Sequence, residues 1–156
     1  MARHLASYGL YPSKSALYTG AEALKAAGFR QTDISVLYSD KSAVMPNSPF
    51  TGLLSYMAGI GAISFPGVGP FLAAGPLSSV FGSLGATARG LLHSLVGLGL
   101  PEPQAQQYAG RLEDGRLMMS VHCDDDVWAG RAHDILQQTG AEDVATAPDA
   151  AAVYQS

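Results

Sequence analysis

Two stretches of this chain share one pattern of strand, helix and strand, which constrains the fold more than any other feature. Within residues 5–40, apolar residues alternate in LASYGLY and again in DISVLYS, and a run with helical spacing separates them. Residues 117–147 repeat this plan. A shift of 112 positions, from 5 to 117, places Leu5 on Leu117, Ser13 on Asp125, Leu24 on Leu136 and Gly28 on Gly140. Strand start, helix cap candidate, core leucine and glycine stop therefore coincide.

Two β-α-β units pair most simply as a four-stranded antiparallel sheet with both helices on one face, the ferredoxin-like split β-α-β arrangement. We therefore predict an α+β fold in a single domain over residues 1–156, long enough to bury a core. Its parts are a first β-α-β unit at 5–40, a glycine-rich insert at 41–100, a helix and the second β-α-β unit at 101–147, and a tail at 148–156. The other sheet face is predicted to be open, with Tyr8, Tyr11, Tyr38 and Tyr56 as candidate lining residues.

The insert is free of charge: no Asp, Glu, Lys or Arg occurs in residues 42–88. The turn sequence PGVGP at 66–70 divides it, which predicts a hairpin of two helical arms at about 50–64 and 72–98. Small residues recur every fourth position along the second arm, namely Ala74, Ser78, Gly82, Ala86, Gly90 and Ser94. Such a strip, of the glycine-zipper kind, lets another helix come close, so these residues are predicted to form a helix-packing or oligomer interface.

The insert has two other possible interpretations. A phosphate-binding loop is disfavoured because the segment has no lysine followed by Ser or Thr, and Pro70 lacks an N–H donor. A membrane hairpin is the stronger alternative, since the second arm would be about 40 Å long at 1.5 Å per residue. Arg89 and His93 would then lie inside the bilayer, and the first arm would measure only about 22 Å. Packing against protein is therefore favoured.

Composition indicates the class of partner. The net charge is −4 and no basic cluster occurs, so no nucleic-acid partner is expected. Apolar residues make up 47% of the chain and charged residues 14%, which leaves apolar surface for self-association into a homo-oligomer. The single cysteine excludes an internal disulfide, and no signal-peptide pattern is evident. A cytoplasmic location is expected, with a membrane surface as the alternative partner.

The stretch VHCDDD at 121–126 gathers an imidazole, a thiol and three carboxylates. Adjacent residues of a strand point to opposite faces, so His122 and Cys123 do not form a catalytic pair, and Cys123 is expected to be buried. The aspartates are expected to cap the next helix. His4, His93 and His133 show no metal-ligand spacing, and Trp128 reads as a core or interface residue. No catalytic, metal-binding or cofactor-binding residue is therefore predicted, and no cofactor.

Three segments carry a family resemblance: ALKAAGFRQTDISVLYSD, MAGIGAISFPGVGPFLAAGP, and LVGLGLPEPQAQQYAGRLEDGRLMMSVHCDDDVWAGRAHDILQQTGAEDV. Together, over about residues 5–147, they resemble the bacterial general stress protein domain family of the YflT type, which has little assigned biochemistry. The PGVGP turn with the following AAGP is among the most specific parts. The resemblance implies association with stress responses and a ferredoxin-like core with a glycine-rich hairpin. It implies no catalytic residues, and Cys123 departs from the family pattern.

These observations favour a non-enzymatic structural or interaction protein, associated with stress, that self-assembles through residues 50–98. The first alternative is a peripheral membrane protein that inserts its hairpin into lipid. The second is a small-molecule-sensing module that uses the open sheet face.

Overall fold

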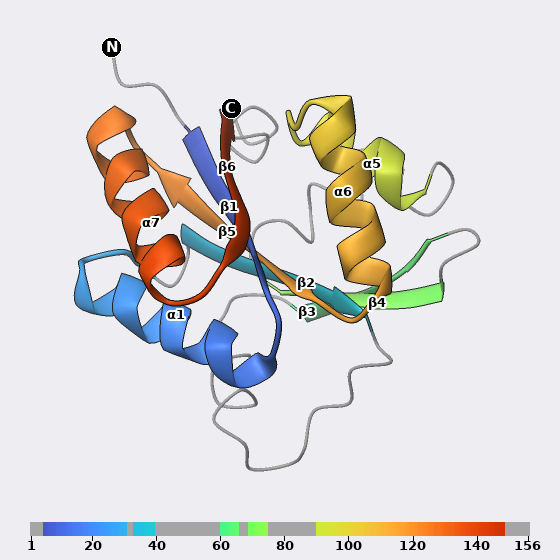
Figure 1. Cartoon of the computed structure of the whole chain (residues 1–156), viewed down its shortest axis with the longest axis horizontal. Coiled ribbons are helices and arrows are strands. Elements are labelled where there is room, and N and C mark those ends of the chain that lie inside the picture. The colour runs from blue at the N-terminus through green and yellow to red at the C-terminus, as the bar shows by residue number, and fades with distance from the viewer. Residues whose placement is uncertain (1–4, 31–32, 40–59, 66–68, 75–89, 149–156) are drawn as a thin grey trace.

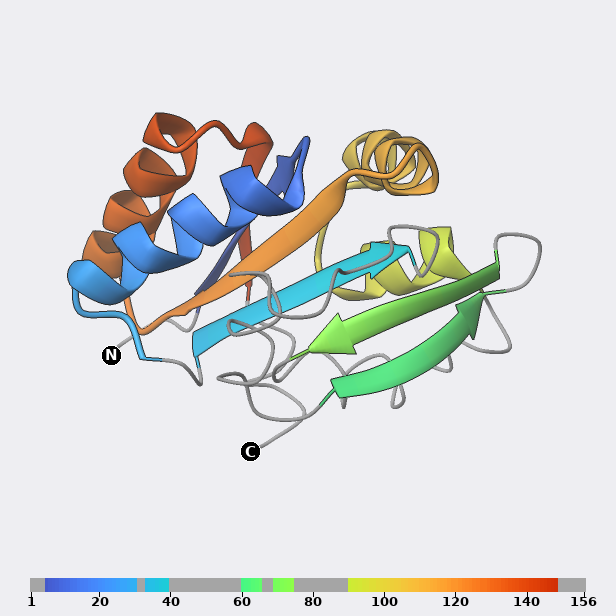
Figure 2. The ribbon, with the colours of Figure 1, turned by 90° about the horizontal axis from the view of Figure 1, so that it is seen from below.

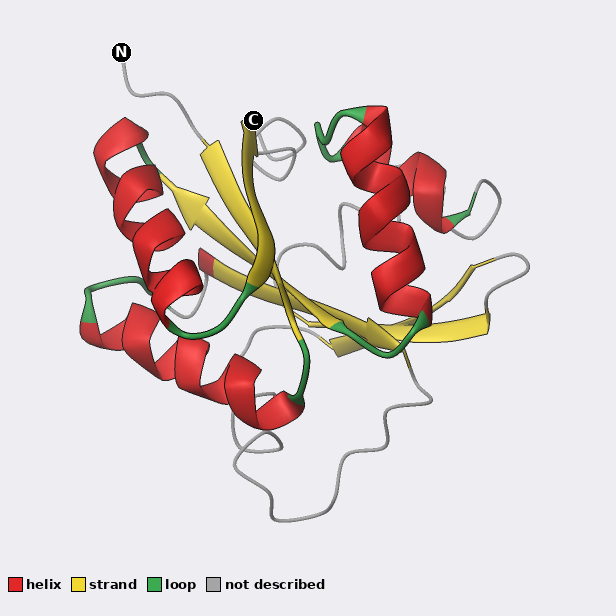
Figure 3. Cartoon of the chain, viewed as in Figure 1, coloured by secondary structure: helices red, strands yellow, loops and turns green. Residues whose placement is uncertain are grey.

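The computed structural model describes residues 5–30, 33–39, 60–65, 69–74 and 90–148 (Figure 1). Figure 3 distinguishes the helices from the strands in this part of the chain. In chain order the elements are β1 (Leu5–Tyr11), α1 (Lys14–Ala26), β2 (Ile34–Ser39), β3 (Ile60–Phe65), β4 (Gly69–Ala74), α5 (Leu91–Gly97), α6 (Glu102–Glu113), β5 (Leu117–Cys123), α7 (Asp126–Gln138) and β6 (Glu142–Pro148). The predicted α+β class is confirmed.

The strands form one six-stranded sheet in the order β3-β4-β2-β5-β1-β6. Every neighbouring pair in it is antiparallel. The prediction of four strands was therefore wrong. The two additional strands, β3 and β4, come from the insert and extend the sheet beyond β2.

The two β-α-β units match more closely than their residue identities suggest. A shift of 112 positions carries β1 onto β5 and α1 onto α7 with the same bounds. Ser13 caps α1 by accepting from Ala16 N, and Asp125 caps α7 by accepting from Trp128 N. Gly28 and Gly140 follow these helices with φ of 108° and 97°, a backbone conformation that favours glycine. The predicted caps and stops are confirmed.

Helices cover both faces of the sheet: α1 and α7 pack on one face, and α5 and α6 pack on the other. In Figure 1 and Figure 2, α1 lies beside α7 toward one end of the sheet, and α5 lies beside α6 toward the other. Alternate residues of β1 belong to two separate buried clusters: Leu5 and Tyr11 pack with α1 and α7, whereas Tyr8 and Leu10 pack with α5 and α6. β1, an interior strand of the sheet, is therefore buried on both sides.

The prediction of an open sheet face was wrong for the described residues. Tyr8, Tyr11 and Tyr38 are all fully buried, and Tyr56 lies outside the described residues. Helix α6 provides part of the cover, because Ala105, Tyr108 and Leu112 form a buried stripe that packs on the sheet.

The predicted helical arms at 50–64 and 72–98 do not form as stated. Residues 60–65 and 69–74 are strands, and within the described part of 72–98 only Leu91–Gly97 is helical. Short apolar runs can form either a helix or a strand. Here they form strands because β4 pairs with the edge of β2 and β3 pairs with β4. None of the helices in the described ranges is both long and apolar enough to cross a membrane.

The predicted strip of small residues is therefore not one continuous helical surface. Ala74 ends β4, and Gly90 precedes α5 with a φ of 96°. Ser94 lies buried in α5, where its hydroxyl donates to Gly90 O at 2.9 Å. Ser78, Gly82 and Ala86 lie outside the described residues. A role for these six positions in association stays a prediction.

Candidate functional site

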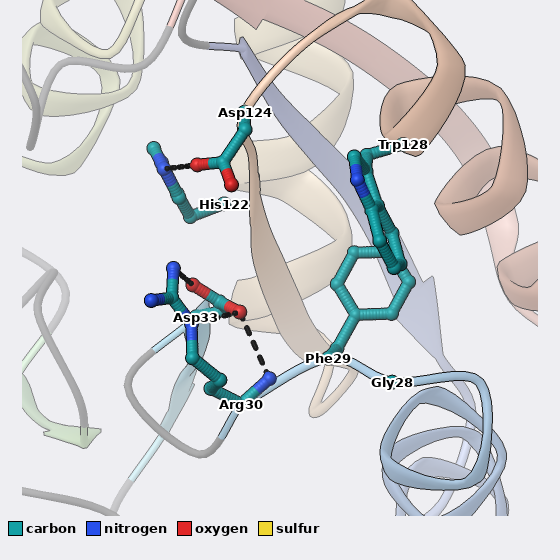
Figure 4. A pocket seen from close by; sticks show the side chains of 7 residues that line it. All are labelled: Gly28, Phe29, Arg30, Asp33, His122, Asp124 and Trp128. Carbon is teal, nitrogen blue, oxygen red and sulfur yellow. Dashed lines mark hydrogen bonds and ion pairs between the residues drawn. The ribbon is translucent and has the colours of Figure 1, made fainter.

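A pocket opens where the end of α1, the end of β5 and the start of α7 meet. Its volume is about 140 Å³, and it is lined by Gly28, Phe29, Arg30, Asp33, His122, Asp124 and Trp128. Figure 4 shows the rings of Phe29 and Trp128 on one side and two pairs of polar side chains on the other. The pocket thus combines one aromatic wall with one charged wall.

The aromatic wall begins at the C-terminus of α1. Gly28 N donates to Lys25 O and Phe29 N to Leu24 O, each at 3.1 Å, which is the Schellman arrangement. Phe29 and Leu24 are both buried in the cluster beneath α1 and α7. The helix ending therefore fixes Phe29 at the pocket, since its backbone and its ring are both held.

Replacing Gly28 with alanine should lower the free energy of unfolding by about 1–2 kcal/mol. The φ of 108° is strained for a residue with a Cβ, and that Cβ would lie 3.4 Å from Trp128 Cη2. Chemical denaturation measures the loss, and Gly130→Ala is the control because no described atom lies within 4 Å of its added Cβ. Equal effects at the two positions would contradict this account.

The Arg30–Asp33 pair forms the first half of the charged wall. The Asp33 carboxylate accepts from Arg30 N at 2.8 Å, from Nε at 3.3 Å and from Nη2 at 3.2 Å. Its side chain is only 9% exposed, whereas that of Arg30 is 67% exposed. The hydrogen bond and charge of Asp33 raise the pKa of Arg30, and the charge of Asp124 adds to them. Arg30 therefore stays cationic and neutralises a carboxylate that burial would otherwise disfavour.

The His122–Asp124 pair forms the second half. His122 Nε2 lies 3.0 Å from Asp124 Oδ1, and the two side chains are 22% and 56% exposed. The side chain of His122 lies on the face of β5 opposite to that of Cys123. Cys123 is buried, as predicted. The turn after β5 brings Asp124 back beside the imidazole, a pairing that strand periodicity alone did not predict.

Trp128 lies in the first turn of α7 and is held from three sides. Its backbone N–H donates to Asp125 Oδ1 at 3.0 Å, and its ring meets Phe29 edge to face with centroids 5.1 Å apart. The Arg131 guanidinium lies 4.9 Å from the ring centroid. Trp128 is thus half-buried. It packs against the core, as predicted, and it also lines the pocket.

The other chemistry-bearing residues do not converge. Within the described ranges no group of three or more His, Cys, Asp or Glu side chains could hold a metal ion. His93 is exposed and His133 is half-buried on separate helices, and His4 lies outside the described residues. The sequence did not predict this pocket. The 112-position repeat pairs the end of α1 with the end of α7, whereas the pocket joins the residues after α1 to the start of α7.

The two edges of the sheet form a second candidate surface, and they differ in chemistry. At the β6 edge, Glu142 and Asp143 bring charge, Pro148 lacks an N–H donor, and the register with β1 shifts between Tyr8 and Leu10. These are features with which proteins block edge pairing. The β3 edge reads IGAISF and has neither charge nor proline. Among the described residues, only β4 pairs with β3.

Comparison with known proteins adds no family to these observations. No protein-family model, curated protein or solved structure matches the chain.

Proposed function

We propose that this chain is a non-enzymatic interaction protein that associates with a second copy of itself through the outer edge of β3. The contrast between the two sheet edges carries the proposal. One edge has charge, proline and a register shift, whereas the other is uncharged over six residues, Ile60–Phe65. An unprotected strand edge offers its N–H and C=O groups to another strand, and two copies related by a two-fold axis pair antiparallel.

This proposal keeps the insert as the assembling element but replaces helix packing by strand pairing. The apolar, charge-free composition of residues 42–88 supports a partner that is itself largely apolar. The earlier strip of small residues is not required for it. A role in stress responses, suggested by the sequence resemblance, is part of the same proposal.

We also propose a ferredoxin-like unit as the core of the fold. Without β3 and β4 the strand order is β2-β5-β1-β6, with α1 and α7 on one face. Each crossover helix follows the first strand of its own unit, as the split β-α-β arrangement requires. The insert then acts as an extension of the sheet at β2.

Ala62→Lys should raise the dissociation constant of the dimer by tenfold or more. Ala62 pairs with Leu72 of β4 near the middle of the edge strand. In a symmetric dimer each change counts twice, because both copies place a lysine at the junction, where charge opposes strand pairing. Sedimentation equilibrium across a concentration series measures the constant.

Thr146→Lys is the matched control, because it adds the same charge to an exposed position on the β6 edge. It should leave the dimer unchanged. A wild-type protein that stays monomeric at every concentration would contradict the proposal, as would equal weakening by the two lysines. Liposome flotation tests the competing membrane partner: flotation that Ala62→Lys abolishes would assign the edge to lipid.

A further inference from the structure

We propose that the pocket at the end of α1 binds an uncharged, single-ring heteroaromatic compound, of the size of a pyrimidine base or nicotinamide. The pocket residues belong to β5, to α7 and to the α1–β2 and β5–α7 connections, so binding there is independent of the proposed self-association. It also differs from the sensing role predicted from the sequence, which relied on an open sheet face.

The volume sets the size of the ligand. The pocket measures about 140 Å³. A cavity of about 150 Å³ holds a benzene-sized molecule, so one ring with small substituents fits and two fused rings exceed the space. The pocket remains open to solvent on the side of Arg30, whose side chain is largely exposed.

The aromatic wall favours a planar partner. In Figure 4 the indole of Trp128 is seen nearly on edge, with one face turned toward the side where Asp124 and His122 lie. The ring is held in place by Phe29, by Arg131 and by the cap at Asp125. A rigid aromatic surface of this kind contacts a planar ring at low cost in side-chain entropy.

The charged wall favours a partner without net charge. Arg30 is already compensated by Asp33, and His122 faces Asp124. An anion beside Arg30 would be repelled by the carboxylates of Asp33 and Asp124. A cation beside Asp124 would be repelled by the guanidinium of Arg30. By contrast, an uncharged ring with donors and acceptors along its edge can hydrogen-bond to both the guanidinium and a carboxylate. Two of the five N–H donors of Arg30 bond to Asp33, and Asp124 Oδ2 has no hydrogen bond to a described residue.

Trp128 makes the test specific, because it is the only tryptophan of the chain. In a ¹H–¹⁵N correlation spectrum of the full chain, the single indole N–H signal reports directly on the pocket. We expect uracil, cytosine or nicotinamide to shift this signal saturably. Benzoate and benzylammonium, of similar size but charged, should bind at least tenfold more weakly.

Variants assign the contacts. Asp124→Ala should weaken binding of the uncharged ring about tenfold, whereas Asp134→Ala, which removes an exposed carboxylate elsewhere on α7, should not. The remaining amide signals establish that each variant is folded. The inference is overturned if none of the three uncharged rings shifts the indole signal, if a charged probe binds more tightly, or if Asp124→Ala and Asp134→Ala behave alike.

Discussion

Replacing Gly20 with alanine is expected to lower the free energy of unfolding by about 2–3 kcal/mol. The added Cβ would lie 2.1 Å from Tyr11 Oη and 2.7 Å from Tyr11 Cζ, well inside contact distance. Tyr11 is fully buried and cannot move aside without loss of its 2.7 Å hydrogen bond to Thr139. Overpacking typically costs about 1–3 kcal/mol and a lost hydrogen bond about 1 kcal/mol, which together outweigh the gain in helix propensity of at most about 1 kcal/mol.

Gly110→Ala is the matched control for this change. Gly110 also lies within a helix, α6, but it is exposed and no described atom lies within 4 Å of an added Cβ. Alanine should there stabilise the protein by about 0.5–1 kcal/mol through helix propensity alone. Urea denaturation of both variants measures the difference. Stabilisation by Gly20→Ala would show that the contact between α1 and β1 is looser than described.

Raising the pH above about 10 should destabilise the protein steeply, because two buried tyrosines hold their protons more tightly when folded. Burial raises the pKa of Tyr11 more than its hydrogen bond to Thr139 lowers it. Burial also raises the pKa of Tyr108, and the charge of Asp143 adds to the effect. The hydroxyl of Tyr108 donates to the backbone carbonyl of Asp143, near the start of β6.

The sign of this pH dependence follows from the number of protons bound in the folded and unfolded states. Tyrosine in the unfolded chain releases its proton near pH 10, whereas these two retain theirs to higher pH in the folded state. Their contribution is therefore fully present below pH 10 and is lost as the pH rises toward the folded pKa values. Each tyrosine should contribute a slope approaching about 1.4 kcal/mol per pH unit.

Denaturation curves from pH 8 to pH 11.5 test this expectation. The doubly substituted protein, Tyr11→Phe with Tyr108→Phe, should lose most of the slope above pH 10, even though it is less stable at pH 8 because two hydrogen bonds are missing. Ionisation of any other group affects both proteins alike, so the comparison between the two proteins is decisive. An unchanged slope in the double variant would rule out these tyrosines as its source.

Local patterns predicted the two β-α-β units correctly. Alternation identified β1, β2 and β5, and helical spacing between a cap residue and a glycine identified α1 and α7. These features depend on neighbours within a few residues, so the sequence displays them directly. The apolar stripe of α6 and the glycine that follows the helix, Gly115, obey the same local rules.

Contacts between distant segments decided what the sequence left ambiguous. Whether IGAISF and GPFLAA become helix or strand depends on the available edge of β2, which lies elsewhere in the chain. The burial of Tyr8 depends on where α5 and α6 pack, and the pocket depends on a turn after α1 meeting a turn after β5.

The amino-acid sequence by itself determined the secondary structure of the repeated units and their helix ends, since backbone conformation and apolar periodicity are local properties. Only the tertiary structure determined that the sheet has six strands, that helices cover both of its faces, and that Arg30, Asp33, His122 and Asp124 face Trp128. The physical reason is that strand pairing, face burial and ion pairing act between residues tens of positions apart, and no short window of sequence contains both partners.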